Sequence, residues 1–314
     1  MSGIKIKSVG SFLPEHVVTN EDMCQIVDTT DEWIQSRTGI RERRKCTTET
    51  QCDLAVNAAR RAMEAAGIRP EQVGVCLVAT LTPHYITPST ACVVQAELGL
   101  LEDTVCFDFN AACSGFVYGL HTIQALLAVS ERKFGIVVGA EVVTRITDYT
   151  DRGTCILFGD GAGAAVVEYA DENPQLPTVI GTRGTWDVLN GPGVGLGKPS
   201  VLYMEGQAVY KFSVGTAPKV VDQVLEKAGL AKEDVDYFVF HQANKRIVDA
   251  VCKHAGIPLE KCYVNIDHVG NTSSACIPIA LTEMKEQGLL KPGTKVLCVG
   301  FGGGFTWGGT LLTF

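Results

Sequence analysis

The chain has 314 residues, of which 46% are hydrophobic, and it carries a formal net charge of −8 at pH 7. This length suits two domains or one large layered unit, and the negative charge argues against a general nucleic-acid-binding protein. No apolar run is long enough to span a bilayer and the N-terminal residues lack a signal-peptide core, so we expect a cytoplasmic protein without membrane contact. The twelve cysteines include no CxxC pair, which argues against a zinc site and predicts free thiols in a reducing compartment.

Taken in chain order, the N-terminal segment predicts a strand followed by two short helices. The first helix starts near Thr19, and the second lies within residues 29–40 and closes at Gly39. Trp33 and Arg37 are four residues apart, so they share one face of the second helix. Two interpretations of Trp33 stay open at this point, namely packing in the core and stacking against a nucleotide base.

The next part of the chain alternates between helices and continuously apolar strands. Such strands are buried on both faces, as in a sheet that is covered by helices. Residues 158–167 are a glycine turn that enters a strand rather than a helix, which excludes a phosphate-binding loop. Residues 170–208 are rich in Gly, Pro and Asp and predict a long irregular connection. The predicted helices are 50–67, 88–98 and 116–127, and the predicted strands are 73–79, 105–109 and 134–138.

The second half of the chain repeats the order of elements in the first half. Three pairs of segments correspond, namely 66–79 with 228–240, 105–108 with 264–267, and 158–167 with 305–312. We therefore expect an α/β protein of two similar halves, 1–170 and 171–314, related by a pseudo-twofold axis. Loops at corresponding strand ends would meet between the halves, where ligands tend to bind.

Cys113 lies between a buried strand and an apolar helix, at or near the N-terminus of that helix. The helix dipole and free backbone N–H groups favour a thiolate there, whereas the alternative is a buried cysteine that only fills space. His241 and Asn271 follow equivalent strands of the second half, so the repeat brings all three residues to one interface. The glycine loop 300–305 offers backbone N–H groups for an oxyanion hole.

Four separated motifs together resemble one known family. They are residues 110–115, 241–247, 270–274 and 300–308, and residues 29–40 and 151–163 match the same family. The family is β-ketoacyl-acyl-carrier-protein synthase III, the initiating condensing enzyme of bacterial type II fatty acid synthesis. The resemblance implies the thiolase fold, in which two βαβαβαββ halves form a five-layered αβαβα arrangement. It also implies a homodimer, no metal, and no cofactor, because coenzyme A enters as the thioester substrate.

The resemblance implies roles for individual residues. Cys113, His241 and Asn271 are the expected catalytic residues, and the backbone N–H groups of Cys113 and Gly303 the expected oxyanion hole. The expected coenzyme A contacts, with the adenine between Trp33 and Arg152, are Trp33, Arg37, Arg152, Met204, Gly206, Asn244 and Phe301. The acyl pocket is expected to involve Ile86, Thr87, Ile156 and Leu189, with a dimer contact closing it near the first two. Apart from the resemblance, the position of the helix after His241 predicts that basic residues on and near it bind the acidic carrier protein, whereas the alternative is an ordinary solvated helix face; these residues are Lys211, Lys245, Arg246 and Lys253.

The expected reaction is a decarboxylative Claisen condensation of an acyl-CoA primer, expected to be acetyl-CoA, with malonyl-acyl-carrier-protein. It proceeds through an acyl-Cys113 intermediate and gives β-ketoacyl-acyl-carrier-protein, CO2 and coenzyme A. The nearest alternative is a condensing enzyme of the same fold in a polyketide or alkylquinolone pathway. A papain-type hydrolase is disfavoured because its cysteine lies near the mature N-terminus, and a non-enzymatic binding module is disfavoured by the intact triad.

Overall fold

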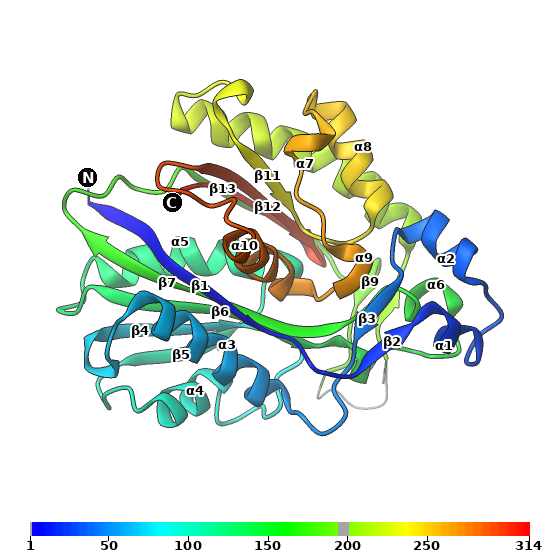
Figure 1. Ribbon diagram of the computed structural model, residues 1–314, viewed down its shortest axis with the longest axis horizontal. Helices are drawn as coiled ribbons and strands as arrows, with labels where there is room; N and C mark the ends of the chain where they lie inside the picture. Colours follow the sequence, from blue (N-terminus) through cyan, green and yellow to red (C-terminus); the bar gives the residue numbers. More distant parts are fainter. Residues whose placement is uncertain (1, 194–200) are drawn as a thin grey trace.

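A computed structural model describes residues 2–193 and 201–314, and it contains two large β-sheets (Figure 1). The first sheet has the strand order β1-β7-β6-β4-β5. β4 is parallel to β5 and β6, whereas β7 is antiparallel to both β6 and β1. The apolar runs 73–79 and 134–138, predicted as strands, lie at the centre of this sheet. The predicted strand 105–109 forms the edge of the sheet and has no fully buried residue, so the prediction that it is buried is wrong. Its strands are β1 (Gly3–Phe12), β4 (Val73–Ala79), β5 (Val105–Phe109), β6 (Phe134–Val142) and β7 (Asp160–Ala170).

The second sheet has the strand order β11-β12-β13-β8. β11 is parallel to β12, whereas β13 is antiparallel to both β12 and β8. This is the same pattern as β4, β6, β7 and β1 of the first sheet, so the predicted repeat is visible in the topology. The strands are β8 (Thr178–Thr185), β11 (Tyr237–Phe240), β12 (Lys295–Gly302) and β13 (Gly304–Thr313).

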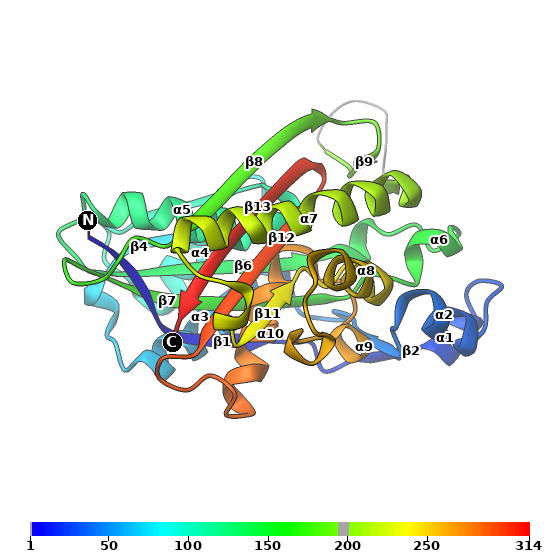
Figure 2. The same cartoon turned by 90° about the horizontal axis from the view of Figure 1, so that it is seen from above.

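Helices separate and cover the two sheets, which gives five layers (Figures 1 and 2). Between the sheets lie α5 (Gly115–Leu127) and α10 (Cys276–Glu286). The outer face of the first sheet is covered by α3 (Gln51–Ala66) and α4 (Thr90–Leu98). The outer face of the second sheet is covered by α7 (Gly206–Ala228) and α8 (Lys245–Ala255). This order confirms the predicted αβαβα arrangement.

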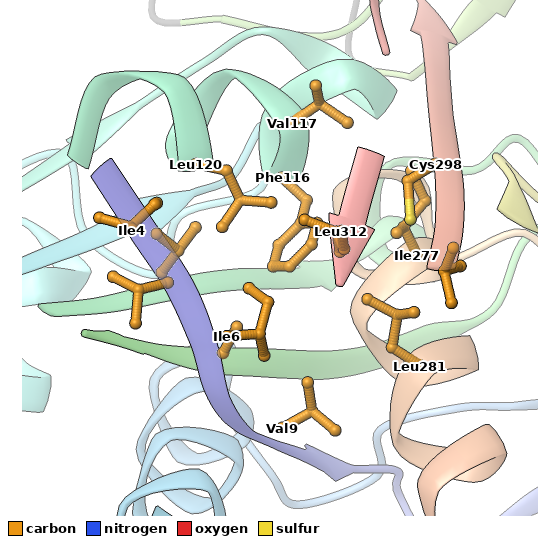
Figure 3. Packing of buried hydrophobic residues seen from close by; sticks show 14 of the residues in the cluster. Ile4, Ile6, Val9, Phe116, Val117, Leu120, Ile277, Leu281, Cys298 and Leu312 are labelled. Carbon is orange, nitrogen blue, oxygen red and sulfur yellow. The ribbon is translucent and has the colours of Figure 1, made fainter. Parts of the chain in front are cut away.

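The central helix layer is apolar on both sides because it packs against both sheets. Figure 3 shows Phe116 and Leu120 of α5 in one cluster with Ile4 of β1, Ile277 of α10 and Leu312 of β13. Burying an apolar side chain of this size contributes roughly 1.5–3 kcal/mol. The two helices α5 and α10, which begin directly after the 3₁₀ turns 112–114 and 273–275, are therefore firmly held.

Shorter elements gather at one end of the molecule, on the right of Figure 1. The hairpin β2–β3 and the pair β9–β10 are both antiparallel. These elements are β2 (Val17–Thr19), α1 (Asn20–Cys24), α2 (Asp31–Thr38), β3 (Glu42–Arg44), α6 (Arg152–Cys155), β9 (Leu189–Asn190), β10 (Tyr203–Met204) and α9 (Ile266–Val269). Short 3₁₀ helices elsewhere are η1 (Pro70–Gln72), η2 (Ala112–Ser114), η3 (Val143–Ile146), η4 (Lys232–Asp234), η5 (Leu259–Lys261) and η6 (Ser273–Ala275).

The predicted start and end of the two N-terminal helices are confirmed. The Thr19 hydroxyl accepts the N–H of Asp22 and caps α1. Gly39 follows α2 with a φ of 79°, a conformation that favours glycine. A Cβ at Gly39 would also lie 2.6 Å from Lys245 Cβ, so glycine lets α2 approach α8.

Two predictions about the second half are wrong. Residues 178–185, predicted as part of an irregular connection, form β8, the counterpart of β1. Residues 194–200 of that predicted connection lie outside the described residues. Residues 264–267, predicted as a strand, instead lead into the helical turn α9, and only a bridge between Phe238 and Cys262 marks the place of a fifth strand.

Candidate active site

Two turns of the same construction lie at the N-termini of the central helices. In η2 the Oδ1 atom of Asn110 accepts the N–H of Ala112 at 2.9 Å, and in η6 the Oδ1 atom of Asn271 accepts the N–H of Ser273 at 2.9 Å. Ala112 and Ser273 both have positive φ, 47° and 51°. The prediction that the turn of Asn271 repeats the turn of Cys113 is confirmed.

Cys113 lies on the first of these turns and lines a cavity of about 1020 Å³. β12 passes close to Cys113: a Cβ added at Gly302 would lie only 2.7 Å from the N atom of Cys113. Glycine at this position keeps space open beside the sulfur. His241 and Asn271 line the same cavity, so the structure brings the three predicted catalytic residues together.

His241 follows directly after β11 and is 2% exposed. Its backbone N–H donates to Val299 O at 2.8 Å, and its ring lies edge-on to Phe301 at 5.4 Å between centroids. Burial lowers the pKa of His241 to about 3, so the imidazole is neutral at pH 7. Its Nδ1 atom has no hydrogen-bond partner within the described residues. A neutral ring offers one donor and one acceptor to a substrate.

Asn271 is held by its backbone and by its own turn. Its N–H donates to Leu157 O at 2.9 Å, and its carbonyl accepts the N–H of Gly159 at 3.0 Å. Because Oδ1 accepts from Ser273, the hydrogen-bond network assigns Nδ2 as the free end of the amide. The side chain is thereby oriented to donate.

The chain around Asn271 is anchored from behind by ion pairs. Arg41 pairs with Asp267, and His268 lies 2.9 Å from Asp267 and 3.2 Å from Glu283. Hydrogen bonding to Glu283, opposed by burial and supported by Asp267, raises the pKa of His268 to about 9. The imidazolium therefore links α9 to α10 across this turn.

The state of the Cys113 sulfur differs from the prediction. Burial raises the pKa of Cys113 to about 12, which outweighs the effect expected from the helix N-terminus. The buried Ser273 hydroxyl, a group that sequence reasoning missed, lowers this pKa, although it has no hydrogen-bond partner within the described residues. The resting nucleophile is therefore a thiol, and it must lose a proton when it reacts.

At the surface, the side chains of Trp33 and Arg152 are already in contact. The Arg152 guanidinium lies 4.6 Å from the Trp33 ring centroid and donates to Asp28 O at 2.9 Å, and Arg37 lies 6.0 Å from the same ring. Trp33 also packs against the hydrophobic cluster that contains Ile34, and it lines the cavity as well. The Trp33 side chain therefore contributes to the core and is also accessible from the cavity. Arg152 has to move before a base can enter between the two side chains.

Four of the residues predicted to contact coenzyme A line the cavity, namely Met204, Gly206, Asn244 and Phe301. Asn244 Nδ2 donates to Arg37 O at 3.0 Å, and its Oδ1 accepts the N–H of Arg246 at 2.8 Å. This amide joins α2 to the start of α8. Two walls of the cavity mouth are thereby fixed to each other.

Only part of the predicted acyl pocket faces the cavity of the single chain. Ile156 and Leu189 line it. Ile86 and Thr87 do not, and Ile86 is 74% exposed. Leu81 and Asn110, which were not predicted, line the cavity instead.

The four predicted basic residues occupy different positions. Lys211 and Arg246 line the cavity, whereas Lys253 does not. Lys245 pairs with Asp249 at 2.7 Å. In the basic run 41–45, Arg43 is buried and donates to Val18, Asn20 and Ile156, so it is part of the scaffold rather than a docking surface.

Comparison with known proteins agrees with this geometry along the whole chain. Residues 107–184 match the family model 3-oxoacyl-[acyl-carrier-protein] synthase III, and residues 225–314 match its C-terminal model. The β-ketoacyl-[acyl-carrier-protein] synthase III of Clostridium acetobutylicum is 46% identical, with 99% of each chain covered. The chain belongs to the β-ketoacyl-acyl-carrier-protein synthase III family.

Solved structures of similar proteins share the fold. The synthase III of Aquifex aeolicus VF5 superposes with a TM-score of 0.94 at 42% identity, covering 99% of this chain and 100% of that one. The priming β-ketosynthase of the R1128 polyketide pathway superposes with a TM-score of 0.93 at 35% identity, covering 99% and 96%. The thiolase fold of this synthase III family member is thereby confirmed.

No group of three or more His, Cys, Asp and Glu side chains within residues 2–193 and 201–314 is arranged to hold a metal ion. No helix in the same residues has the length and apolarity needed to cross a membrane.

Proposed function

We propose that the chain catalyses the initiating condensation of type II fatty acid synthesis, in which an acyl-CoA primer is joined to malonyl-acyl-carrier-protein. The observation that carries this function is the position of Cys113 in the cavity of about 1020 Å³ that His241 and Asn271 also line. The relatives named above as synthase III support the same acyltransferase reaction. All twelve cysteines are free thiols, which supports action in the reducing cytoplasm.

In the first step Cys113 attacks the thioester carbonyl of the acyl-CoA. Because the resting sulfur is a thiol, it has to lose its proton as the new carbon–sulfur bond forms, and the imidazole of His241, which lines the same cavity, is the proposed acceptor. The backbone N–H groups of Cys113 and Gly303 hold the oxyanion of the tetrahedral intermediate. The bond to the coenzyme A sulfur then breaks, and the proton passes to that sulfur. The products are acyl-Cys113 and free coenzyme A.

In the second step malonyl-acyl-carrier-protein enters the same cavity. His241 and Asn271 donate hydrogen bonds to its thioester carbonyl. The bond between the malonyl carboxylate and Cα breaks, CO2 leaves, and the electron pair forms an enolate whose charge strengthens both hydrogen bonds. The enolate carbon attacks the carbonyl of acyl-Cys113 and displaces the sulfur as a thiolate, which takes a proton from solvent water. Donors that strengthen with developing charge favour the transition state over the ground state.

The cavity mouth supplies contacts for both substrates. Trp33 and Arg152 receive the adenine of coenzyme A once Arg152 turns away, and Arg37 lies near the phosphates. Arg246 and Lys211 line the cavity and face the carrier protein, with Lys245 and Lys253 at the periphery. Cations at this rim oppose the overall charge of −8 where acidic partners approach.

The active form proposed here is a homodimer. β5 is an edge strand, and its side chains Val105 and Phe107 are 46% and 36% exposed. Ile86 is 74% exposed near Thr87. A second copy that covers this edge removes the apolar surface from water and brings Ile86 and Thr87 toward an acyl pocket. Light scattering should give a dimer for the wild type and a monomer for Phe107→Glu.

Intact-mass spectrometry tests the reaction. Acetyl-CoA alone should add one acetyl group to the wild type and none to Cys113→Ala. His241→Ala should lose acylation and malonyl decarboxylation together, whereas Asn271→Ala should keep acylation and lose about 10²–10³ in decarboxylation rate. Labelling of another cysteine with Cys113 unmodified contradicts the assignment.

A starter condensation of a polyketide pathway is the second candidate, because the R1128 priming β-ketosynthase is 35% identical. Competition between acetyl-CoA and longer or branched acyl-CoA primers separates the two. Preference for acetyl-CoA supports the fatty acid reaction, and preference for a longer starter supports the second candidate.

A further inference from the structure

The two halves carry different residues at one pair of corresponding positions, namely Glu141 in β6 and Gly302 in β12. A Cβ at Gly300 of β12 would lie 2.9 Å from Ser114 Cα, and a Cβ at Gly139 of β6 would lie 2.4 Å from Ser274 O. The two strands thus cross the two reactive turns at the same point. Two residues further along, β12 has Gly302 and β6 has Glu141.

Glu141 fills the space beside Ser274 that corresponds to the space left open by Gly302 beside Cys113. Its carboxylate reaches Ser274, which stands in η6 where Cys113 stands in η2. The Ser274 hydroxyl donates to Glu141 Oε1 at 2.7 Å. Glu141 is 0% exposed although it carries an ionisable group. A carboxylate in such a place needs several donors.

The other donors to Glu141 come from the first half. The Thr82 hydroxyl donates to Oε2 at 2.6 Å, the N–H of Leu81 at 3.1 Å and the Thr80 hydroxyl at 3.2 Å. Leu81 lines the cavity, and Ser274 belongs to the turn that also holds Asn271. One carboxylate therefore fastens the Asn271 turn of the second half to the segment after β4 of the first half.

We propose that Glu141 is a positioning residue for the decarboxylation step, in that its carboxylate fixes the turn from which Asn271 donates to the malonyl thioester. This inference rests on the function proposed above. The amide of Asn271 is oriented within its turn by Ser273, so the position of the amide follows the position of the turn as a whole. Cys113 acylation uses η2 and β12, and none of the hydrogen bonds of Glu141 is made to these two elements.

Position rather than charge is the basis of this role. The Ser274 hydroxyl also lies 3.0 Å from Ala79 O, so it can donate there and accept from an amide. A glutamine at position 141 keeps one oxygen for Thr82 and Leu81 and turns its NH₂ group to Ser274. Glu141→Gln is therefore the conservative variant, whereas Glu141→Ala removes the connection.

The experiment measures both half-reactions of the full-length protein for each variant. Acylation of Cys113 by acetyl-CoA is followed by intact mass, and CO2 release is followed from malonyl-acyl-carrier-protein. Glu141→Ala should keep acylation within about threefold and lose about tenfold to a hundredfold in CO2 release, less than the loss from Asn271→Ala. Glu141→Gln should restore CO2 release to within about threefold of the wild type.

Ser274→Ala is the second variant, because it removes the hydroxyl that donates to Glu141 Oε1 and leaves Glu141 itself in place. It should lower CO2 release more than acylation, and the double variant with Glu141→Ala should be no worse than Glu141→Ala alone. Asp160→Asn is the matched control, since Asp160 is also buried and accepts hydrogen bonds, but from Thr144 and Cys46. Its ratio of the two rates should equal that of the wild type.

Equal loss of both half-reactions in Ser274→Ala, or a Gln variant as impaired as the Ala variant, overturns the role of Glu141. These outcomes leave the proposed function intact if the wild type shows both half-reactions. A wild type that shows neither half-reaction overturns the function and, with it, this inference.

Discussion

Alkylation of Cys113 should depend on pH far beyond the range of an ordinary cysteine. Burial raises the pKa of the thiol from 9.0 to about 12. At pH 7 the thiolate fraction is then about 10⁻⁵, against about 10⁻² for a thiol of pKa 9, so alkylation should be about a thousandfold slower than that of such a thiol. The rate should rise about tenfold with each pH unit and reach no plateau below about pH 10.

The assay is a time course with iodoacetamide, quenched and read by mass spectrometry of the peptide that contains Cys113. N-acetylcysteine in the same buffer calibrates the reagent at each pH. Ser273→Ala should slow the reaction further, because it removes a hydroxyl that lowers the pKa of Cys113. A plateau at or below pH 8 would refute the reasoning, since the helix N-terminus would then outweigh burial and His241 would not be needed as a proton acceptor.

Three further outcomes follow from the geometry. His268→Asn should lower the free energy of unfolding by about 1 kcal/mol below pH 6.5, after allowance for partial solvent screening. Because the pKa of His268 in the folded state is raised above its ordinary value, this loss of stability should disappear as the pH rises through about 9. Urea unfolding below pH 6.5 and above pH 9 measures the difference. Gly302→Ala should slow acylation severely, since its Cβ would lie 2.7 Å from the N atom of Cys113, whereas Gly215→Ala, with nothing within 4 Å, should not. Arg246→Glu should raise the KM for malonyl-acyl-carrier-protein severalfold at low salt and change acylation by acyl-CoA much less; unchanged carrier kinetics would place the docking face elsewhere.

The fold was predictable where local pattern and burial agree. The apolar run 73–79 has every residue buried, so its composition and its place in the sheet point to the same assignment. β8 was missed because its middle and end are exposed and contain Gly, Thr and Arg, which carry little apolar signal. Val264 and Ile266 gave residues 264–267 the apolar signal of a strand. In the structure Asp267 and His268 lie in the helical turn α9, where His268 pairs with Asp267 and with Glu283 of α10.

The site was predictable in its residues and less so in its electrostatics. The internal repeat predicts from the sequence alone that Cys113, His241 and Asn271 meet at one interface, and all three line the same cavity. The pKa of Cys113 depends on how deeply both halves bury it, which no local pattern encodes. Glu141 carried a readable signal, because it is the single carboxylate within the apolar run 134–142. The exposure of Ile86 in one chain leaves its predicted place in the acyl pocket dependent on the proposed second copy.

The burial of α5 between two sheets ties the nucleophile to the whole molecule. Cys113 extends from the start of a helix that packs against β4 and β6 of the first sheet and β12 and β13 of the second, so no local fraying releases it. The hydrogen-bonded backbone amides of α5 should exchange with solvent only through global opening, and acylation in denaturant should disappear together with the tertiary core. The rim formed by short elements such as α2 and α6 has no such protection. Substrate affinity can therefore change during evolution, or fade on heating, while the chemistry of the sulfur stays intact.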